Sequence, residues 1–401
     1  MSTDFLIAVE GNRTAALKKK IIHYYIANGD ATIADLCKEM DLSIPTVTKL
    51  VGELLEEGYI LDFGKQETSG GRKPNIYGLN PESGYFIGVD VRRDSINIAA
   101  VDFKGKFISV EDEVPFTLEN TQAALENLCI IIDEFIGSLK VSRDKILSVG
   151  INITGRVNPI SGYSYSFFYF EEKPLSLIIE ERLKLKVYIE NDTRAMAYGE
   201  YMKGAVKGEK NLIFVNISWG LGVGIILDGK LYYGKSGFSG EFGHFCLYDN
   251  EIICHCGKKG CLETEASGSA LHRMLIERYK EGSSTILADK INSGAEITLN
   301  DLIDAIQKED VLSIEILEHI GTNLGKAIAG LMNIFNPELV ILGGGLSLTD
   351  EYIRLPIKSA VRKYSLNLVN QDTEIKISKL GDHAGVLGAC LLSRGKILGM
   401  I

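Results

Sequence analysis

Four residues between Gly240 and Ser267 offer one imidazole and three thiols within a short segment: His244, Cys254, Cys256 and Cys261. This number and softness of ligands suits a closed tetrahedral zinc site. Gly257 and Gly260 would permit the sharp turn that returns the chain to the last cysteine. A closed site leaves no coordination position for water, so we expect zinc to hold this loop rather than to take part in a reaction. The alternative is a set of free buried cysteines.

Two carboxylates flank these ligands, Glu241 on the amino-terminal side and Glu263 on the carboxyl-terminal side. Ionised carboxylates on a metal-pinned loop are suited to accepting hydrogen bonds from sugar hydroxyl groups. The alternative is that both carboxylates are exposed to solvent and have no binding role. Within this segment we expect His255 to point outward and Cys246 to lie in the core.

Composition narrows the class of protein that must position these residues. The 401 residues allow two or three domains, and 45% hydrophobic with 24% charged residues is ordinary for a globular chain. The sequence has no apolar run long enough to span a membrane and no signal-peptide pattern at its start, so we expect a cytoplasmic protein without a membrane partner. The scattered cysteines outside the cluster fit a reducing compartment. A net charge of −10 argues against coating nucleic acid, yet leaves room for a local DNA-reading element.

Apolar residues recur at helical spacing from residue 14 to residue 59 and predict three short helices. The first should break at 28–30, Thr32 can cap the second, and Ser43 can cap the third, in which Pro45 comes early. This layout is that of a helix-turn-helix with its turn at residues 41–42, although a plain three-helix bundle has the same core pattern. In the DNA-binding motif, the start of the last helix enters the major groove. The residues that we expect near bases and phosphates are Ser43, Thr46, Thr48 and Lys49.

Two alternating segments, 59–63 and 75–79, follow these helices and predict a wing around the glycine-rich tip 64–74. Arg72 and Lys73 at this tip could contact phosphates or reach into a minor groove. Residues 1–80 hold more acidic than basic side chains. We therefore expect focused DNA contact, made bivalent by a dimer.

The body of the chain is duplicated. Residues 85–105 and 211–230 both read as a strand, a tight turn and a second strand, which predicts an α/β protein of two similar lobes with a ligand cleft between them. A strand near 187–190 leads into Asn191 and Asp192, where Asp192 could activate a hydroxyl group or merely cap a helix starting at Thr193. Residues 336–345 read as a buried strand that ends in three glycines. Further helical patterns occur at 121–139, 193–202, 267–281, 298–307, 311–334 and 351–364.

Taken together, these motifs resemble the ROK family of sugar kinases and sugar-responsive repressors over nearly the whole chain. The most specific segments are the GH and CHCGKKGCLE of the zinc cluster, SGGRKP before LNPESGYFIGVDV, END at 190–192, and NPELVILGGGLS. The resemblance is to the branch with a winged helix-turn-helix, which includes repressors of xylose and N-acetylglucosamine use. It implies a winged helix-turn-helix at 1–80 and an actin-like, hexokinase-like and ribonuclease H-like body, with lobes at 81–200 and 201–401 and a carboxyl-terminal segment that packs back on them.

The resemblance also implies roles for residues. Asp192 falls on the catalytic base of the family's kinases, and His244 would both bind zinc and lie beside the sugar. The positions at which family members contact sugar are Asn191, Asp192, Glu241, His244 and Glu263.

Two departures separate the repressor from the kinase. Family kinases have D-x-G-G-T where this chain has residues 90–94 with Arg92, Arg93 and Asp94, and their G-T-G turn is Gly-Leu-Gly at 220–222. Losing both phosphate-binding turns should remove phosphoryl transfer, which depends on positioning and neutralising the phosphates. No catalytic residue is then expected.

We therefore expect a repressor that binds operator DNA as a homodimer or homotetramer and takes a sugar or sugar phosphate between its lobes. The alternatives are an active sugar kinase with a DNA-binding arm, supported by Asp192 and the three glycines, and a DNA-bound scaffold with an empty cleft.

Overall fold

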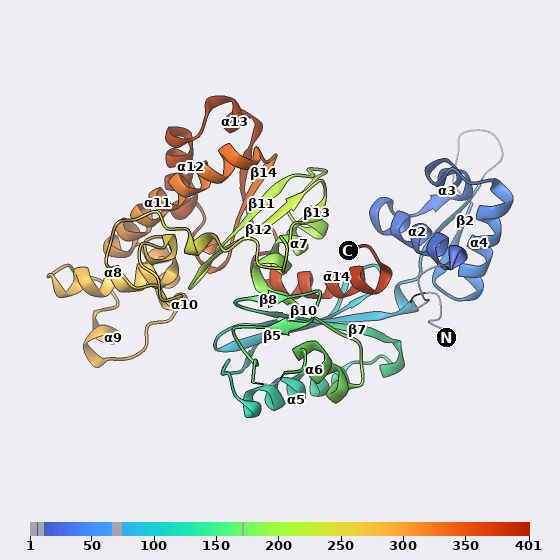
Figure 1. Cartoon of the computed structure of the whole chain (residues 1–401), viewed down its shortest axis with the longest axis horizontal. Helices are drawn as coiled ribbons and strands as arrows, with labels where there is room; N and C mark the ends of the chain where they lie inside the picture. The colour runs from blue at the N-terminus through green and yellow to red at the C-terminus, as the bar shows by residue number, and fades with distance from the viewer. Residues whose placement is uncertain (1–5, 7–11, 66–73, 171) are drawn as a thin grey trace. The chain divides into compact units, whose positions relative to one another are not determined.

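The helix-turn-helix expected near the amino terminus is present. Three helices carry its core, α2 (Arg13–Asn28), α3 (Ile33–Met40) and α4 (Ile44–Glu56), and Figure 1 shows them together beside a small sheet. The sheet has the order β1-β3-β2, formed by Ala31–Thr32, Asn75–Leu79 and Ile60–Lys65. Each of the core side chains is at most 4% exposed: Ile21, Ile22, Leu36, Val47, Leu50, Val51 and Leu54. The expected winged helix-turn-helix is therefore confirmed.

Caps at the helix ends explain where these helices begin and stop. Thr32 and Asp35 form a capping box on α3, and Asp41 ends that helix in the left-handed region with a φ of 51°. Ser43 precedes α4, but its hydroxyl does not cap the helix. It hydrogen-bonds instead with the Thr46 hydroxyl at 2.8 Å. The expected capping role of the Ser43 side chain is therefore wrong, although the helix begins where the sequence indicates.

A buried lysine ties the first helix of this domain to the third. Lys18 is 6% exposed, and its ammonium group lies 2.8 Å from Glu53 and 2.6 Å from Glu57. We expect Lys18→Ala to lower the free energy of unfolding by about 2 kcal/mol, because two partly buried carboxylates lose their shared partner. Urea denaturation measures the change. Lys20→Ala, at an exposed position of the same helix, should leave stability unaltered. Equal stability of Lys18→Ala and the unmodified protein would contradict the assignment.

The structure, a computed structural model, describes residues 6, 12–65, 74–170 and 172–401. These belong to two compact units: unit 1 comprises 1–153, 161–190 and 389–401, and unit 2 comprises 154–160 and 191–388. Among the described residues, no helix is both long and apolar enough to cross a bilayer. The short strands β8 (Val157–Asn158) and β9 (Tyr163–Ser164) pair with each other in a two-stranded sheet. Its 3-10 helices are η1 (Pro81–Ser83), η2 (Arg143–Lys145), η3 (Phe242–His244), η4 (Leu262–Thr264), η5 (Gly345–Thr349) and η6 (Gly381–His383).

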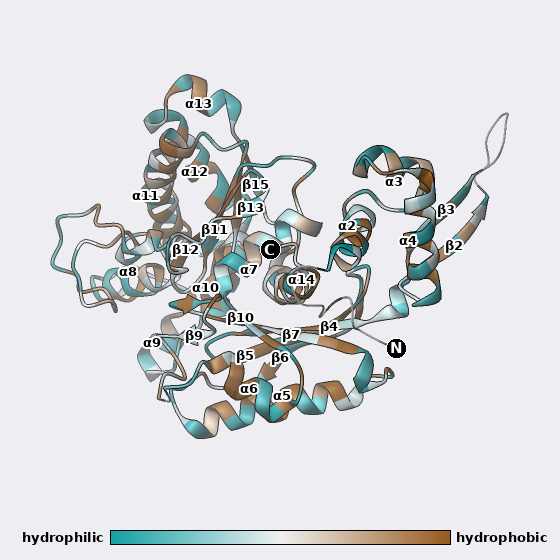
Figure 2. Cartoon of the chain, turned by 45° about the vertical axis from the view of Figure 1, so that its right-hand side comes forward, coloured by the Kyte–Doolittle hydropathy of each residue, from teal (hydrophilic) through white to brown (hydrophobic). Residues whose placement is uncertain are grey.

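The larger sheet of unit 1 has the order β10-β7-β4-β5-β6. Its strands are Val187–Asn191, Ile146–Ile153, Tyr85–Val91, Ser95–Asp102 and Phe107–Pro115. Helices α5 (Gln122–Ser138) and α6 (Leu175–Leu183) lie on one face and α14 (Ala384–Leu398) on the other (Figures 1 and 2). Contact with α14 is close, because a Cβ atom on Gly150 of β7 would lie 2.2 Å from the Ala389 carbonyl oxygen. In Figure 2, α5 and α6 carry both hydrophobic and hydrophilic residues, as amphipathic helices with one buried face do.

The sheet of unit 2 has the order β13-β12-β11-β14-β15. Its strands are Lys230–Leu231, Leu221–Leu227, Leu212–Ile217, Leu339–Gly343 and Glu374–Ile377. Apolar side chains of the sheet and of the surrounding helices form one hydrophobic core. The helices of this unit are α7 (Asp192–Lys203), α8 (Gly268–Lys280), α9 (Ala288–Ser293), α10 (Leu299–Gln307), α11 (Val311–Phe335), α12 (Glu351–Tyr364) and α13 (Asn367–Asp372).

The two sheets repeat one plan, which confirms the predicted duplication. In each, the first two strands form an antiparallel hairpin, and the first strand also pairs in parallel with the fourth. The third and fifth strands then complete opposite edges. The expected actin-like arrangement of two related α/β halves behind a winged helix-turn-helix is therefore the fold of this chain.

Candidate functional site

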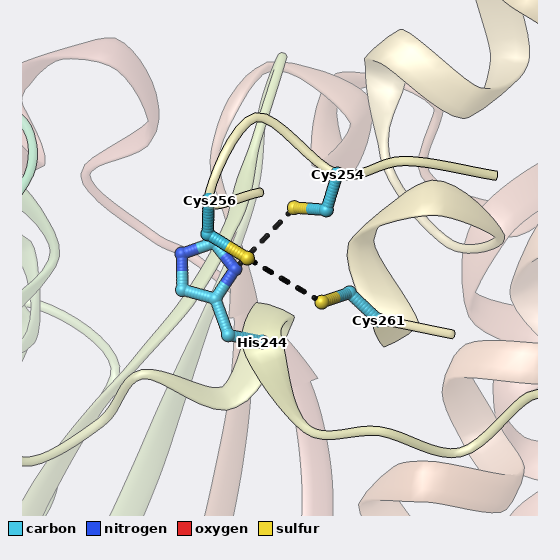
Figure 3. A group of neighbouring side chains, drawn as sticks. All are labelled: His244, Cys254, Cys256 and Cys261. Atoms are coloured by element: carbon cyan, nitrogen blue, oxygen red, sulfur yellow. Dashed lines mark hydrogen bonds between the residues drawn. The ribbon is translucent and has the colours of Figure 1, made fainter. Parts of the chain in front are cut away.

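The four proposed metal ligands lie together in unit 2. One ligand atom from each of His244, Cys254, Cys256 and Cys261 lies within 4.8 Å of all the others. Figure 3 shows the imidazole and the three thiols pointing toward a common centre. His244 Nδ1 is 3.6 Å from Cys254 Sγ, and the sulfurs of Cys256 and Cys261 are also 3.6 Å apart. A set of one imidazole and three thiols at these separations fits a soft tetrahedral cation.

The backbone brings the cysteines together through one tight turn. Gly257 has a φ of 82° and Gly260 a φ of 73°, in the region that glycine adopts without strain. The Cys254 amide donates to the Lys258 carbonyl and the Gly257 amide to that of Cys254, both at 2.8 Å. Burial raises the pKa of the Cys254 thiol. A coordinated cation would reverse that effect, because a metal-bound thiol is deprotonated.

Cys246 does not lie in the core, contrary to the expectation from its position. Its side chain is exposed, with Sγ 3.7 Å from the Lys259 carbonyl oxygen. Cys246 pairs with Cys261 in an isolated antiparallel β-bridge. In this pair the buried cysteine is Cys261, which is 1% exposed, whereas Cys246 faces solvent. Cys246 also lies outside the cluster of four ligand atoms.

Glu263 is held from two directions beside this loop. One carboxylate oxygen accepts the Leu221 amide at 3.1 Å, and the other lies 2.8 Å from His255 Nδ1. The Glu263 side chain is only 9% exposed, and despite its burial the pKa of Glu263 is lowered, mainly by the hydrogen bond from His255. His255 does point outward, as expected, but its bond to Glu263 was not foreseen. Glu241 is near the ligands too, because its carboxylate lies 3.8 Å from His244 Nε2.

Asn191 and Asp192 begin helix α7 at the end of strand β10. Asn191 is the cap: its Oδ1 accepts the Arg194 amide at 3.1 Å, and its Nδ2 donates to the Gly155 carbonyl oxygen at 3.0 Å. Asp192 is the first helical residue, so the expected helix start at Thr193 is one residue late. Its carboxylate accepts the Thr193 amide at 2.7 Å. Burial raises the pKa of Asp192, and the hydrogen bonds from its neighbours only partly offset that effect. Asn191, not Asp192, therefore provides the side-chain cap of this helix.

One hairpin brings these two groups of residues together. Asn216 of β11 donates to Thr193 Oγ1 at 2.9 Å, next to Asp192. On β12, Leu221 donates to Glu263, and Val223 donates to the Gly240 carbonyl oxygen, immediately before Glu241. The β11–β12 hairpin therefore contacts both the start of α7 and the segment from Gly240 to Glu263.

Side chains of this chain contact groups in the altered turn at 90–94 and in the three-glycine turn at 343–345. In unit 1, Arg92 Nε lies 3.2 Å from a carboxylate oxygen of Asp90, which is 1% exposed. In unit 2, the Ser218 hydroxyl donates to Asn216 Oδ1 at 2.7 Å and accepts the Gly345 amide at 3.3 Å. In the first turn, the Asp90 carboxylate is therefore paired with the Arg92 guanidinium group. In the three-glycine turn, the Gly345 amide already donates to Ser218. The role of Ser218 could not be read from its spacing.

The residues expected to contact DNA line the start of α4. Ser43, Thr46, Thr48 and Lys49 are all exposed, while Val47 between them is buried. Lys49 has a side chain that is 78% exposed. Arg72 and Lys73 lie outside the residues that the structure describes.

A winged helix-turn-helix ahead of a duplicated hexokinase-like body defines a class of DNA-binding proteins built on a sugar-kinase fold. The chain belongs to the ROK family, whose model matches residues 86–396, and a winged helix-turn-helix DNA-binding model matches residues 15–60. A xylose repressor of Caldicellulosiruptor bescii is 33% identical over 356 residues, with 88% of this chain and 89% of the relative covered.

Two solved structures extend the comparison. A ROK family transcriptional regulator, a homologue of the Escherichia coli MLC protein, matches with a TM-score of 0.81 and 27% identity, covering 96% of this chain and 98% of its own. A ROK family glucokinase from Streptomyces griseus, in complex with glucose and AMPPNP, matches with a TM-score of 0.68 and 28% identity. It covers 78% of this chain and 99% of its own. The match to the regulator extends over the amino-terminal winged helix-turn-helix as well, because it covers 96% of this chain, whereas the match to the glucokinase covers 78%.

Proposed function

We propose that this protein is a sugar-responsive transcriptional repressor of genes for carbohydrate use. The observation that carries the proposal is that one chain combines a DNA-binding domain with a sugar-kinase fold whose kinase motif is altered. The chain has a winged helix and the residues that we propose contact sugar, while Arg92 engages Asp90 in the altered turn at 90–94 and Ser218 engages the three-glycine turn at Gly345. The proteins that match nearly the whole chain include a xylose repressor and a ROK family transcriptional regulator, which supports the same function.

The effector in this proposal is a sugar or sugar phosphate bound in unit 2. Asn191, Asp192, Glu241, His244 and Glu263 would supply its hydrogen bonds, because carboxylates and amides match the hydroxyl groups of a sugar. The ion held by His244 and the three cysteines would be zinc, which prefers this ligand set. A zinc ion with four protein ligands supplies no reactive water, so its chemistry is structural: it would fix the loop that carries Glu241 and leads into Glu263.

DNA is the second partner. Ser43, Thr46, Thr48 and Lys49 would contact bases and phosphates from α4, and Arg72 with Lys73 would add contacts from the wing. We propose residues 1–80 as the DNA-binding domain, followed by lobes at 81–200 and 201–401. A homodimer, or a homotetramer built from two such dimers, would recognise a two-fold operator. Sugar would alter DNA affinity only if it binds one arrangement of the protein better than another.

A sugar kinase is the second candidate, favoured by Asp192 with its raised pKa and by the glucokinase likeness. Against the kinase, Arg92 pairs with Asp90 and stands where the kinase motif has a glycine. Phosphoryl transfer depends on such glycine turns to position the phosphates. Incubation of the metal-loaded protein with ATP, Mg²⁺ and a panel of sugars tests the choice. We expect some sugar to raise the melting temperature without ATP and no phosphorylated sugar to form. ATP-dependent phosphorylation would establish the kinase instead.

Asp192→Asn should separate sugar binding from stability. Burial raises the pKa of Asp192 in the folded protein, so ionisation of this carboxyl costs stability, and the free energy of unfolding falls as pH rises through that pKa. The amide removes this penalty, so at pH 7 the variant should be at least as stable as the unmodified protein. Sugar affinity should fall about 10- to 100-fold, because an ionised acceptor is lost.

Calorimetric titration with the sugar and thermal unfolding measure the two effects of Asp192→Asn. Asp372→Asn, at an exposed position of the same unit, is the matched control and should change neither. Undiminished sugar affinity in Asp192→Asn would remove Asp192 from the binding site.

A further inference from the structure

An apolar side chain stands exposed at the start of the helix proposed to enter DNA. Ile44 is the first residue of α4 and is 65% exposed. The same helix already buries Val47, Leu50 and Leu54 at 4% exposure or less, and these side chains form its contact with the domain core. The side chain of Ile44 therefore contributes little to the core of the domain, and its exposure to water has a free-energy cost.

The neighbours of Ile44 make this surface apolar and uncharged. Pro45 is exposed and has no amide hydrogen to donate. The hydroxyl groups of Ser43 and Thr46 hydrogen-bond each other at 2.8 Å. The first turn of α4 contains no acidic residue, although acids are favoured at that position of a helix. An acid there would repel phosphates, so its absence suits a helix end that approaches DNA.

The edge of a base pair in the major groove offers one apolar group, the 5-methyl group of thymine. We infer that Ile44 determines part of the operator sequence by packing on this methyl group, with Pro45 beside it. The inference rests on the proposed function, because it requires α4 to lie in the major groove. The inference specifies a thymine in each half-site, which Ile44 recognises by its methyl group rather than by hydrogen bonds.

Deoxyuridine tests this contact, because it pairs as thymine does and lacks only the methyl group. The operator is first recovered by binding the full-length protein to fragmented genomic DNA and sequencing what is retained. Duplexes with each thymine of a half-site replaced in turn by deoxyuridine are then titrated by fluorescence anisotropy. We expect one position to weaken binding about fourfold, the factor that corresponds to burying one methyl group.

Variants assign the contact to Ile44. Ile44→Ala should bind thymine and deoxyuridine duplexes equally at that position, Ile44→Val should keep part of the difference, and both should unfold at the same temperature as the unmodified protein. Ile334→Ala, at a 75% exposed position of α11, is the matched control and should respond as the unmodified protein does.

The outcomes separate this inference from the proposed function. Specific DNA binding that ignores every thymine replacement, or an Ile44→Ala protein that remains sensitive at the same position, would overturn the inference alone. If no specific DNA sequence is retained, both the inference and the proposed function fail.

Discussion

Replacing Cys254 by serine is expected to take the metal content of the purified protein from about one ion per chain to nearly none. Cys254 is 3% exposed, and its sulfur lies 3.6 Å from both His244 Nδ1 and a carboxylate oxygen of Glu263. Serine offers a poor ligand to a soft cation, and the affinity for metal should fall by more than about 100-fold. Without the ion, the loop that carries Glu241 and leads into Glu263 is no longer fixed, so sugar affinity should fall at least about tenfold.

Plasma mass spectrometry measures the metal, and calorimetry measures sugar binding to the same samples. Cys246→Ser is the control, because it changes an exposed thiol of the same loop that lies outside the ligand cluster. It should keep both the ion and the sugar. Metal retained at full occupancy by Cys254→Ser would show that these four residues are not the site.

Reversing one charge on α4 should have the largest effect on DNA binding. Lys49 is exposed and lies 3.9 Å from Glu53, too far for a strong ion pair. In a two-fold complex, Lys49→Glu changes the contact twice, so we expect operator affinity to fall about 100-fold and the salt dependence to weaken. Sugar affinity should not change. Anisotropy titrations at several salt concentrations measure these effects.

Lys280→Glu is the matched control for Lys49→Glu, with the same charge change at an exposed position of unit 2. It should leave operator affinity within about twofold, since an exposed charge that makes no contact with DNA is screened by salt. Equal losses in the two variants would indicate an effect of net charge instead of a contact made by α4.

Periodicity predicted the amphipathic elements well, because one face of each packs on a core. Helix α12 has the expected bounds, Glu351–Tyr364, and α5 and α8 differ from the prediction only at their capping residues. Helix α14 was not predicted. Nearly all of its residues from Ala384 to Arg394 are buried, so no polar stripe marks a helical period.

The candidate site also contains features that the sequence predicted and contacts that it did not. Three cysteines and a histidine in one segment indicate a metal site by composition, and the structure brings all four together. The contact between His255 and Glu263 depends on the orientation of one imidazole side chain. The hydrogen bond that Ser218 accepts from the Gly345 amide joins two segments that are far apart in sequence. Spacing carries no signal for such contacts. Resemblance to a family indicated the candidate sugar-binding residues, whereas the departure from the kinase motif at 90–94 was visible directly in Arg92 and Arg93.

Coupling between the two ligands is the property that separates a sugar-responsive repressor from a kinase or a passive DNA-bound protein. The decisive measurement is the affinity of the full-length, metal-loaded protein for its recovered operator, titrated with and without each sugar and sugar phosphate. We predict that a sugar that binds without ATP changes operator affinity at least about fivefold, the lower end of ordinary allosteric coupling. A sugar that saturates the protein and leaves operator affinity unchanged would contradict the proposed function.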